Sequence, residues 1–515
     1  MGFEDSYVAV LKRLPGVAEP IKRQTFKEKL KWTGIVLLIY FFMTQITVYG
    51  VSKTNYDYFK YLEILLGSTF GSLVTLGIGP IVTASIILQL LVGSKIIPWN
   101  LSEEKGRTLF QGTQKLLAIF LCLVEGYVYV AFGAIAAGPG LLPLVILQLA
   151  MGGWIVLFMD EVVSKWGFGS GVGLFIVAGV AKTMVLRALN PLTSDGTIST
   201  GIQNPPAGAI PNAALLIGAG EPLNAFITML PVIATMIVFM LVVYVQAIRV
   251  EIPLAFSTVR GFGRRWPLKF LYTSNIPVIL IGALLANVQV FAKMLAQQGG
   301  NEWVGTFDAQ GNPTGGIIFF LMHPRTTAIS GMMISIGLFA LLGALLVYFT
   351  KRKTGSAIKI VVGMGIAGGL AWHFGMMSMG LTSLVNISAI DIARLFTYAL
   401  FMIGGSVMFS YFWVNTAGMD AKTVASQIES TGMQIPGFRR DIRIIEKVLN
   451  RYIPALAVLG GAAVGFLASF ADFTDALGTG TGILLSVMIV YQLYEQISMQ
   501  HMEDMHPALR RFFGK

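Results

Sequence analysis

The sequence has little charge, few histidines and almost no cysteine. Only 12% of its 515 residues are charged, whereas 55% are hydrophobic, and the mean hydropathy is +0.72. The single cysteine, Cys122, lies within an apolar run, which excludes an intrachain disulfide and a cysteine cluster for a metal ion. This composition excludes an ordinary soluble domain and is typical of a protein that crosses a membrane many times.

Motifs for nucleotide binding and catalysis are also missing. No GxxxxGK-S/T phosphate loop occurs in the chain, and the four histidines lack metal-ligand spacing. Residues 363–368 match the dinucleotide fingerprint GxGxxG, but the run stays apolar to Leu381, where a nucleotide-binding βαβ unit would carry an acidic residue. Small residues that allow close helix packing explain it better. We therefore expect no enzyme activity, no catalytic residue, no metal site and no cofactor.

Twelve apolar runs follow a polar, basic segment at 1–31, and each is near the roughly 20 residues that cross a bilayer as a helix. They lie at 32–50, 75–93, 116–137, 140–159, 171–189, 224–248, 275–296, 327–350, 360–381, 395–414, 453–471 and 481–499. No apolar core with a cleavage site precedes them, so we expect no removable signal peptide. If the N-terminus is cytoplasmic, thirty of the 37 Lys and Arg residues fall in cytoplasmic segments. The positive-inside rule then places both termini in the cytoplasm.

The stretch 75–97 carries a helix break inside an apolar run. It begins with Gly77, Gly79 and Pro80, which a plain membrane anchor would not contain. Just upstream, the apolar piece 59–70 is too short to cross a bilayer and should enter the membrane without crossing it. Irregular backbone at that depth is tolerated only where protein or water surrounds it, so we infer a cavity or pore.

Six motifs occur in the order found in one known family. They are TLGIGPIVT at 75–83, GFGSGVGLFI at 167–176, RVEIP at 249–253, SNIP at 274–277, WVNTAGMD at 413–420 and GTGTGILL at 478–485. On these residues the chain resembles the archaeal form of SecY, the channel subunit of the Sec protein translocase. The resemblance covers nearly the whole chain apart from 326–390. It implies a channel that moves unfolded polypeptides across the membrane and releases transmembrane segments laterally into the bilayer.

The resemblance implies an all-α polytopic membrane protein whose core has ten spans in two pseudo-symmetric halves of five. The implied parts are a cytoplasmic segment at 1–31, an N-terminal half at 32–189, an external loop at 190–223, a C-terminal half at 224–499 and a cytoplasmic tail at 500–515. This chain departs from the pattern at about 327–381, where two apolar runs flank the basic sequence KRKTGSAIK. We expect an inserted transmembrane hairpin with a cytoplasmic turn, which makes twelve spans.

A protein channel must pass a polypeptide yet block ions when idle, and a ring of aliphatic side chains does this by dewetting. The family's pore ring corresponds here to Ile78, Val82, Val172, Ile176, Ile279 and Leu485. Any one of these residues alone is more often explained by ordinary packing. Their places beside Gly and Pro breaks in four separate motifs favour the ring.

Two further elements of the family map onto this chain. The run at about 59–70 matches the plug that blocks the outer side of the ring, with Phe59, Leu62, Leu65, Leu66, Gly67, Ser68 and Phe70 as plug residues. A re-entrant structural helix is the alternative. The lateral gate between the second and seventh core spans corresponds to Thr83, Glu125 and Asn287, polar residues that are costly within a membrane when unpaired.

Two long loops on the predicted cytoplasmic side, 249–269 and 420–451, are strongly basic. Topology alone is one explanation, and a docking surface for a large polyanion is the other. In the family these loops reach the ribosome, and Arg260 and Arg439 fall at positions that resemble its ribosome-contacting arginines.

The resemblance also implies the partners and the location. The expected partners are the SecE and Sec-beta subunits, the ribosome, nascent chains with signal sequences, and membrane lipid, without direct DNA binding. The expected location is the cell (plasma) membrane. A twelve-span secondary transporter is the rival interpretation, but transporters usually carry intramembrane charges for coupling ions, and the predicted span centres lack them apart from Glu125.

Charge reversal at Arg260 and Arg439 tests the docking hypothesis. We expect the double Arg→Glu variant to bind ribosomes more weakly and with a shallower salt dependence, because phosphate contacts are lost. Co-sedimentation with ribosomes over a salt series measures both quantities, and detergent extraction checks that the channel still assembles. An unchanged affinity and salt slope would leave topology as the only role of these charges.

Overall fold

The computed structural model describes most of the chain. The described residues are 3–11, 13–22, 24–51, 69–99, 101, 103–131, 135–193, 197–256, 263–273, 275–297, 302–308, 313–324, 326–350, 354–430, 433–434 and 441–505. The helices are α1 (Phe3–Leu11), α2 (Phe26–Met43), α4 (Gly79–Gly93), α5 (Glu104–Ala131), α6 (Leu142–Trp166), α7 (Gly171–Leu189), α8 (Ala209–Gly218), α9 (Pro222–Ala247), α10 (Ile276–Gln297), α11 (Gly316–Phe320), α12 (Thr327–Thr350), α13 (Thr354–Ser378), α14 (Ala389–Thr416), α15 (Ala421–Ser430), α16 (Ile442–Phe473) and α17 (Gly480–Met505), with the 3-10 helix η2 (Thr382–Leu384). The strands are β1 (Arg249–Phe256), β2 (Gly263–Lys269), β3 (Thr306–Phe307), β4 (Pro313–Gly315) and β5 (Met433–Gln434).

Nine described helices are long and apolar enough to cross a membrane: α5, α6, α7, α9, α10, α12, α13, α14 and α16. They coincide with nine of the twelve predicted runs. The other three runs coincide with α2, α4 and α17. Of these, α2 begins with charged residues and α4 has only 15 residues. The twelve-span count therefore stays a prediction, whereas the polytopic helical architecture is confirmed.

Several helix ends differ from the predicted runs because side chains cap them. Thr25 and Glu28 form a capping box in which the Thr25 N–H donates to Glu28 Oε2 at 2.9 Å, so α2 begins at Phe26. Asp441 caps α16 by accepting the N–H of Arg443 at 2.9 Å, and this helix therefore starts eleven residues before the predicted run at 453–471. The loop predicted at 420–451 thus contains α15 and the first turns of α16.

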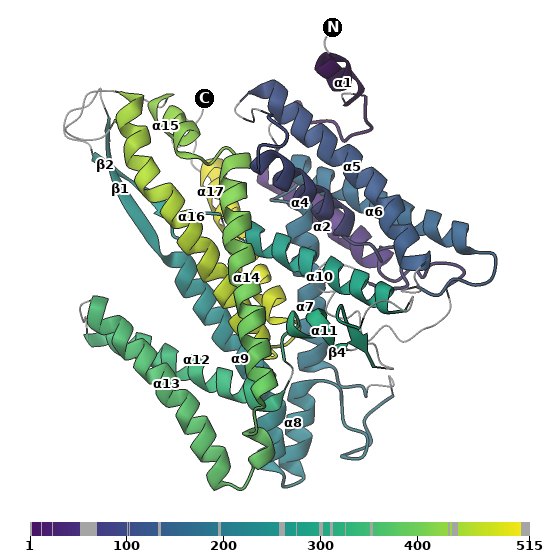
Figure 1. Ribbon diagram of the computed structural model, residues 1–515, viewed down its shortest axis with the longest axis vertical. Coiled ribbons are helices and arrows are strands. Elements are labelled where there is room, and N and C mark those ends of the chain that lie inside the picture. Colours follow the sequence, from purple (N-terminus) through teal and green to yellow (C-terminus); the bar gives the residue numbers. More distant parts are fainter. Residues whose placement is uncertain are drawn as a thin grey trace.

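The all-α prediction missed two small sheets, a three-stranded one with strand order β2-β1-β5 and a two-stranded one formed by β3 and β4. In the antiparallel pair β1–β2, Arg249 lies opposite Lys269. Pro253 and Pro267 lie inside these strands and weaken the strand signal in the sequence. The strands form because alternate residues, including Ile252 and Leu268, are buried in a second hydrophobic cluster against α15 and α16. The three-stranded sheet lies at one end of the molecule, beside α15 and α16 (Figure 1).

Three polar contacts attach this end of the molecule to the rest of the protein. The Tyr272 hydroxyl donates to the carbonyl of Met419 at 2.8 Å, which joins the segment before α10 to the segment after α14. Burial and the neighbouring Asp420 raise the pKa of Tyr272 to about 12, so the hydroxyl keeps its proton at physiological pH. Arg249 and Lys269, at the base of the β-hairpin, both form ion pairs with Glu495 of α17.

The helices form two groups with one shared hydrophobic core. In Figure 1, α1, α2, α4, α5 and α6 lie on one side, whereas α9, α12, α13, α14 and α16 lie on the other, with α10 between them. Helix α7 follows and contacts α6 of the first group, whereas α10 packs mainly on α14, and α17 packs on α9 and α16, of the second group. The two groups meet where α4 packs against α10 and α14, and where α7 packs against α17. The stacked rings of Tyr40 and Phe175, with centroids 4.8 Å apart, join α2 to α7.

Helices α12 and α13 pack side by side at the position of the predicted hairpin and project from the bundle (Figure 1). Glycine permits their contact: a Cβ on Gly331 would lie 2.0 Å from the Trp372 ring. A Cβ on Gly368 would lie 2.6 Å from the Ser335 carbonyl oxygen, and the Ser335 hydroxyl donates to the Gly368 carbonyl at 2.8 Å. Within the GxGxxG run at 363–368, Gly368 therefore serves close helix packing, whereas a Cβ on Gly365 would make only ordinary contact with Ile336 at 3.6 Å and one on Gly363 would meet nothing within 4 Å.

Gly368 and Gly363 on α13 offer a matched test of this packing. We expect Gly368→Ala to lower the free energy of unfolding by about 1–3 kcal/mol, because the new methyl group meets the α12 backbone. Gly363→Ala is the control, since nothing lies within 4 Å of its Cβ position. We expect it to be neutral or to stabilise by up to about 1 kcal/mol through helix propensity. Thermal unfolding in detergent measures both, and equal effects would contradict the packing role.

Candidate functional site

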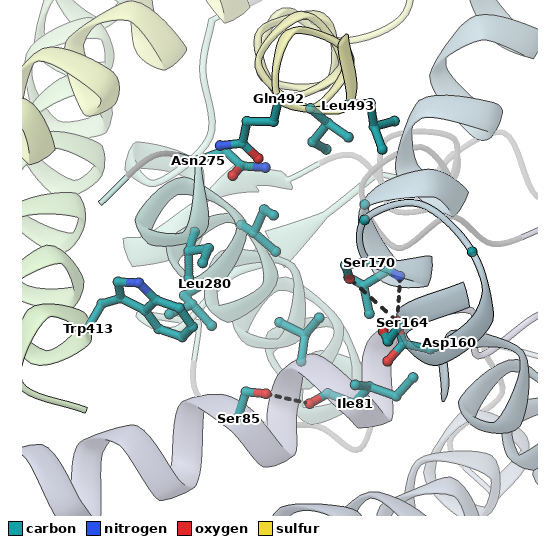
Figure 2. A pocket seen from close by; sticks show the side chains of 18 of the residues that line it. Ile81, Ser85, Asp160, Ser164, Ser170, Asn275, Leu280, Trp413, Gln492 and Leu493 are labelled. Atoms are coloured by element: carbon teal, nitrogen blue, oxygen red, sulfur yellow. Dashed lines mark hydrogen bonds between the residues drawn. The ribbon is translucent and has the colours of Figure 1, made fainter. Parts of the chain in front are cut away.

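A cavity of about 630 Å³ lies between α4, α5, α6, α7, α10 and α17 (Figure 2). Part of its wall is apolar and consists of Ile81, Val82, Val172, Ile276, Ile279, Leu280, Ile489 and Leu493. The polar part of the wall consists mainly of hydroxyl, carboxamide and charged side chains: Lys29, Ser85, Gln89, Gln114, Asp160, Ser164, Ser170, Asn275, Gln492 and Gln496. The polar side chains can form hydrogen bonds with water or a polypeptide in the cavity, whereas the apolar side chains cannot.

The structure brings three of the six predicted ring residues to the wall of this cavity. Val82 comes from α4, Val172 from α7 and Ile279 from α10. The other three, Ile78, Ile176 and Leu485, are no more than 1% exposed and belong to the main core. Each lies on or beside a helix that lines the cavity. The aliphatic character of this region is therefore observed, and its closure into one ring stays a prediction.

The break predicted before Pro80 is present, and it sets where α4 begins. Gly77 has a left-handed φ of +52°, and the helix starts at Gly79 although the apolar run starts at residue 75. The irregular segment before it is buried: a Cβ on Gly152 of α6 would lie 1.8 Å from the Leu73 carbonyl oxygen. The Leu73 N–H donates to the Ile46 carbonyl at 3.0 Å. Other parts of the protein therefore surround this non-helical backbone, as a membrane requires.

Two aspartates beside the ring helices were not among the predicted site residues. Asp160 of α6 accepts the backbone N–H of Val172 in α7, at 2.9 Å. Asp472 of α16 accepts the backbone N–H of Thr481 in α17, at 2.8 Å. A signal for both was present in the sequence, since each is an acidic residue at the end of an apolar run that a glycine-rich turn follows.

The three predicted gate residues lie together. The Asn287 Nδ2 of α10 donates to the Thr83 hydroxyl of α4 at 3.2 Å. The carboxylate oxygens of Glu125, on α5, are buried beside Thr83 and form no hydrogen bond of regular geometry within the described part of the chain. A direct polar link therefore joins the two helix groups at the point where α4 meets α10.

Most plug residues and both docking arginines lie outside the described residues: Phe59, Leu62, Leu65, Leu66, Gly67, Ser68, Arg260 and Arg439. Phe70 is the exception among the plug residues. It is buried, and its ring stacks on Tyr129 with centroids 5.8 Å apart.

Comparisons with known proteins identify similar chains. The SecY family model matches residues 72–494, and the model described as the plug domain of Sec61p matches residues 38–71. The protein translocase subunit SecY of Pyrococcus furiosus is 39% identical over 531 aligned residues that cover 100% of both chains. A solved structure of a protein-conducting channel is 39% identical, with a TM-score of 0.75 and coverage of 97% of this chain and 98% of the other. Sec61 in a canine ribosome-channel complex from the endoplasmic reticulum is also 39% identical, with a TM-score of 0.73 and the same coverage.

The link between α4 and α10 is measurable by a double-mutant cycle of Thr83→Val and Asn287→Leu. Each single replacement leaves one polar partner unpaired, so we expect the two costs not to add. The coupling should be about 0.5–1.5 kcal/mol in the free energy of unfolding. Thermal unfolding of the four proteins in lipid nanodiscs provides the cycle, and strictly additive costs would show that the hydrogen bond contributes nothing.

Proposed function

This chain belongs to the SecY family, and we infer from that membership that it is the channel subunit of a protein translocase, through which unfolded polypeptides cross the membrane. The observation that carries the inference is the match of the SecY family model to residues 72–494. The cavity between the two helix groups supports it, because its polar lining suits a hydrated polypeptide. Family membership also decides against the secondary-transporter interpretation.

We propose that Ile78, Val82, Val172, Ile176, Ile279 and Leu485 form the constriction of the channel. Three of them line the cavity, and three are buried in the adjoining core. A narrow aliphatic constriction gives water no hydrogen bonds, and an ion inside it would lose hydration without gaining ligands. The same side chains can rotate apart for a passing polypeptide, since no specific bond has to break.

The segment at about 59–70 is proposed to be a plug that closes the outer side of this ring. The match of the plug-domain model to residues 38–71 supports it. The buried ring of Phe70 on Tyr129 fits a plug whose C-terminal end is anchored against α5.

The contact between α4 and α10 is proposed to be the lateral gate through which hydrophobic segments leave for the bilayer. Its support is the hydrogen bond from Asn287 to Thr83, with the buried Glu125 carboxylate beside it. The hydrogen bond contributes only about 1 kcal/mol, and the rest of the α4–α10 contact is side-chain packing that an entering hydrophobic segment could replace with its own.

The proposed topology has twelve spans, and both termini lie in the cytoplasm. The proposed location is the plasma membrane. It comprises two halves, 32–189 and 224–499, with α12 and α13 as an added hairpin whose turn is cytoplasmic. The asymmetry of Lys and Arg between the two sides supports it. Labelling of a cysteine at position 356 from outside intact cells would contradict it. The proposed external loop at 190–223 contains the helix α8.

The proposed partners are a ribosome on the basic loops, and SecE and Sec-beta subunits. For the ribosome, the support is the likeness to Sec61 from a ribosome-channel complex, together with the sheet and α15–α16 that form an ordered base for those loops. The two small subunits are carried over from the resemblance of the motifs.

Simultaneous replacement of Ile78, Ile176 and Ile279 by serine tests the seal. The hydroxyl groups should wet the constriction, so the idle channel should conduct ions while it still moves substrate. Idle conductance in a planar bilayer is measured with and without deletion of 59–70, because the plug could mask the leak. Ile329→Ser is the control, since Ile329 is equally buried but lies on α12. If neither triple variant conducts more than its parent, the ring assignment is wrong.

A further inference from the structure

We propose that Asp160 and Asp472 are positioning residues of the channel, each holding one ring helix at the depth and rotation that the seal needs. The proposal rests on the proposed function of the ring. Neither aspartate belongs to the ring. Each acts through a helix that carries a ring residue, Ile176 on α7 and Leu485 on α17.

Asp160 joins α6 to the first turn of α7. Its Oδ1 accepts the Val172 N–H at 2.9 Å and the Ser170 hydroxyl at 3.4 Å, and Figure 2 shows these bonds at the edge of the cavity. A Cβ on Gly171 would lie 2.5 Å from the Asp160 Cα, so only glycine lets the two backbones approach so closely. The contact is tight as well as polar.

Asp472 makes the corresponding contact at the first turn of α17. Its Oδ1 accepts the Thr481 N–H at 2.8 Å, and its Oδ2 accepts both the Thr481 hydroxyl and, at 2.7 Å, the Tyr398 hydroxyl of α14. A Cβ on Gly480 would lie 1.8 Å from the Ala471 carbonyl carbon. This carboxylate is 3% exposed, whereas Asp160 lines the cavity.

The two contacts follow the same geometric rule. In both, the carboxylate comes from the preceding long helix and binds the N–H of the second residue of the ring helix, Val172 or Thr481. In both, a ring residue lies four positions later, at Ile176 or Leu485, which is one helical turn or about 6 Å along the axis. On α7, Val172 itself is a second ring residue. The carboxylate therefore fixes the helix close to the side chain that closes the channel.

The turns that precede these helices contain glycines in left-handed or related conformations. Gly169 has a φ of +72° and Gly478 a φ of +101°, which are conformations that glycine adopts readily. By contrast, a charge-assisted hydrogen bond to a backbone N–H is among the stronger polar contacts in proteins. If a carboxylate is lost, α7 or α17 should shift or rotate and open the aliphatic constriction even though every ring residue is still present.

The test measures idle current of the assembled channel in a planar bilayer, in a protein that lacks 59–70 so that the plug does not mask a leak. We expect Asp160→Ala and Asp472→Ala each to raise the current about tenfold, because the lost bond shifts the population toward displaced helices. The idle current of Asp160→Asn should stay near that of the parent protein, since the carboxamide oxygen still accepts the Val172 N–H. Asp160→Glu should leak, since it keeps the charge but displaces the acceptor by one methylene group.

Asp391→Ala is the matched control. Asp391 caps α14 with Ser388, and α14 carries no ring residue, so this variant should lose a cap without leaking. If Asp160→Asn restores the low idle current that Asp160→Ala loses, the leak comes from the lost hydrogen-bond acceptor and not from general instability. If an alanine variant does not assemble, the Asp160→Glu variant tests the proposal instead. An idle current in Asp160→Glu equal to that of the parent protein would overturn the proposal. If the triple serine variant leaks but Asp160→Ala does not, the positioning role fails while the ring stands, and if neither leaks, both fail.

Discussion

Inside a bilayer every backbone N–H and C=O must find its partner within the protein, and this requirement shapes the centre of the molecule. In this protein, α4, α7 and α17 begin beside the residues of the proposed constriction. Each such start exposes unpaired N–H groups. The structure covers them with the irregular segment 69–78 packed on α6, and with the carboxylates of Asp160 and Asp472.

The same requirement explains why the contacts within the helix groups differ in kind from the contacts between them. Contacts within each helix group are extensive, and carboxylates and backbone approaches at glycine hold the helix starts. Across the groups, α4 and α10 are joined by a neutral hydrogen bond between Asn287 and Thr83. This hydrogen bond adds to the apolar packing of the shared core, and apolar side chains can separate without breaking specific bonds, which suits a channel that must open without unfolding. The charge-assisted contacts hold the starts of α7 and α17, next to the proposed constriction.

Much of the fold was predictable because membrane helices have a strong signal. Nine of the twelve predicted runs became long apolar helices, and the break before Pro80 is present. Close helix packing at the GxGxxG run is found at Gly368 but not at Gly363. The β1–β2–β5 sheet was missed, since Pro253 and Pro267 interrupt its strands and its stability comes from distant partners in α15 and α16. The longer α16 was missed because its first turns are amphipathic rather than apolar.

The sequence by itself determined the family, the polytopic class, the order of the helices and the residue types at the candidate ring and gate. These properties depend on local composition and on motifs that are contiguous in the chain. Only the tertiary structure decided which groups meet: Asn287 with Thr83, Asp160 with the start of α7, and Asp472 with the start of α17. The physical reason is that a hydrogen bond depends on the distance and angle between atoms that packing brings together. Spacing in the chain carries no record of either for residues that are 204 positions apart, as Thr83 and Asn287 are.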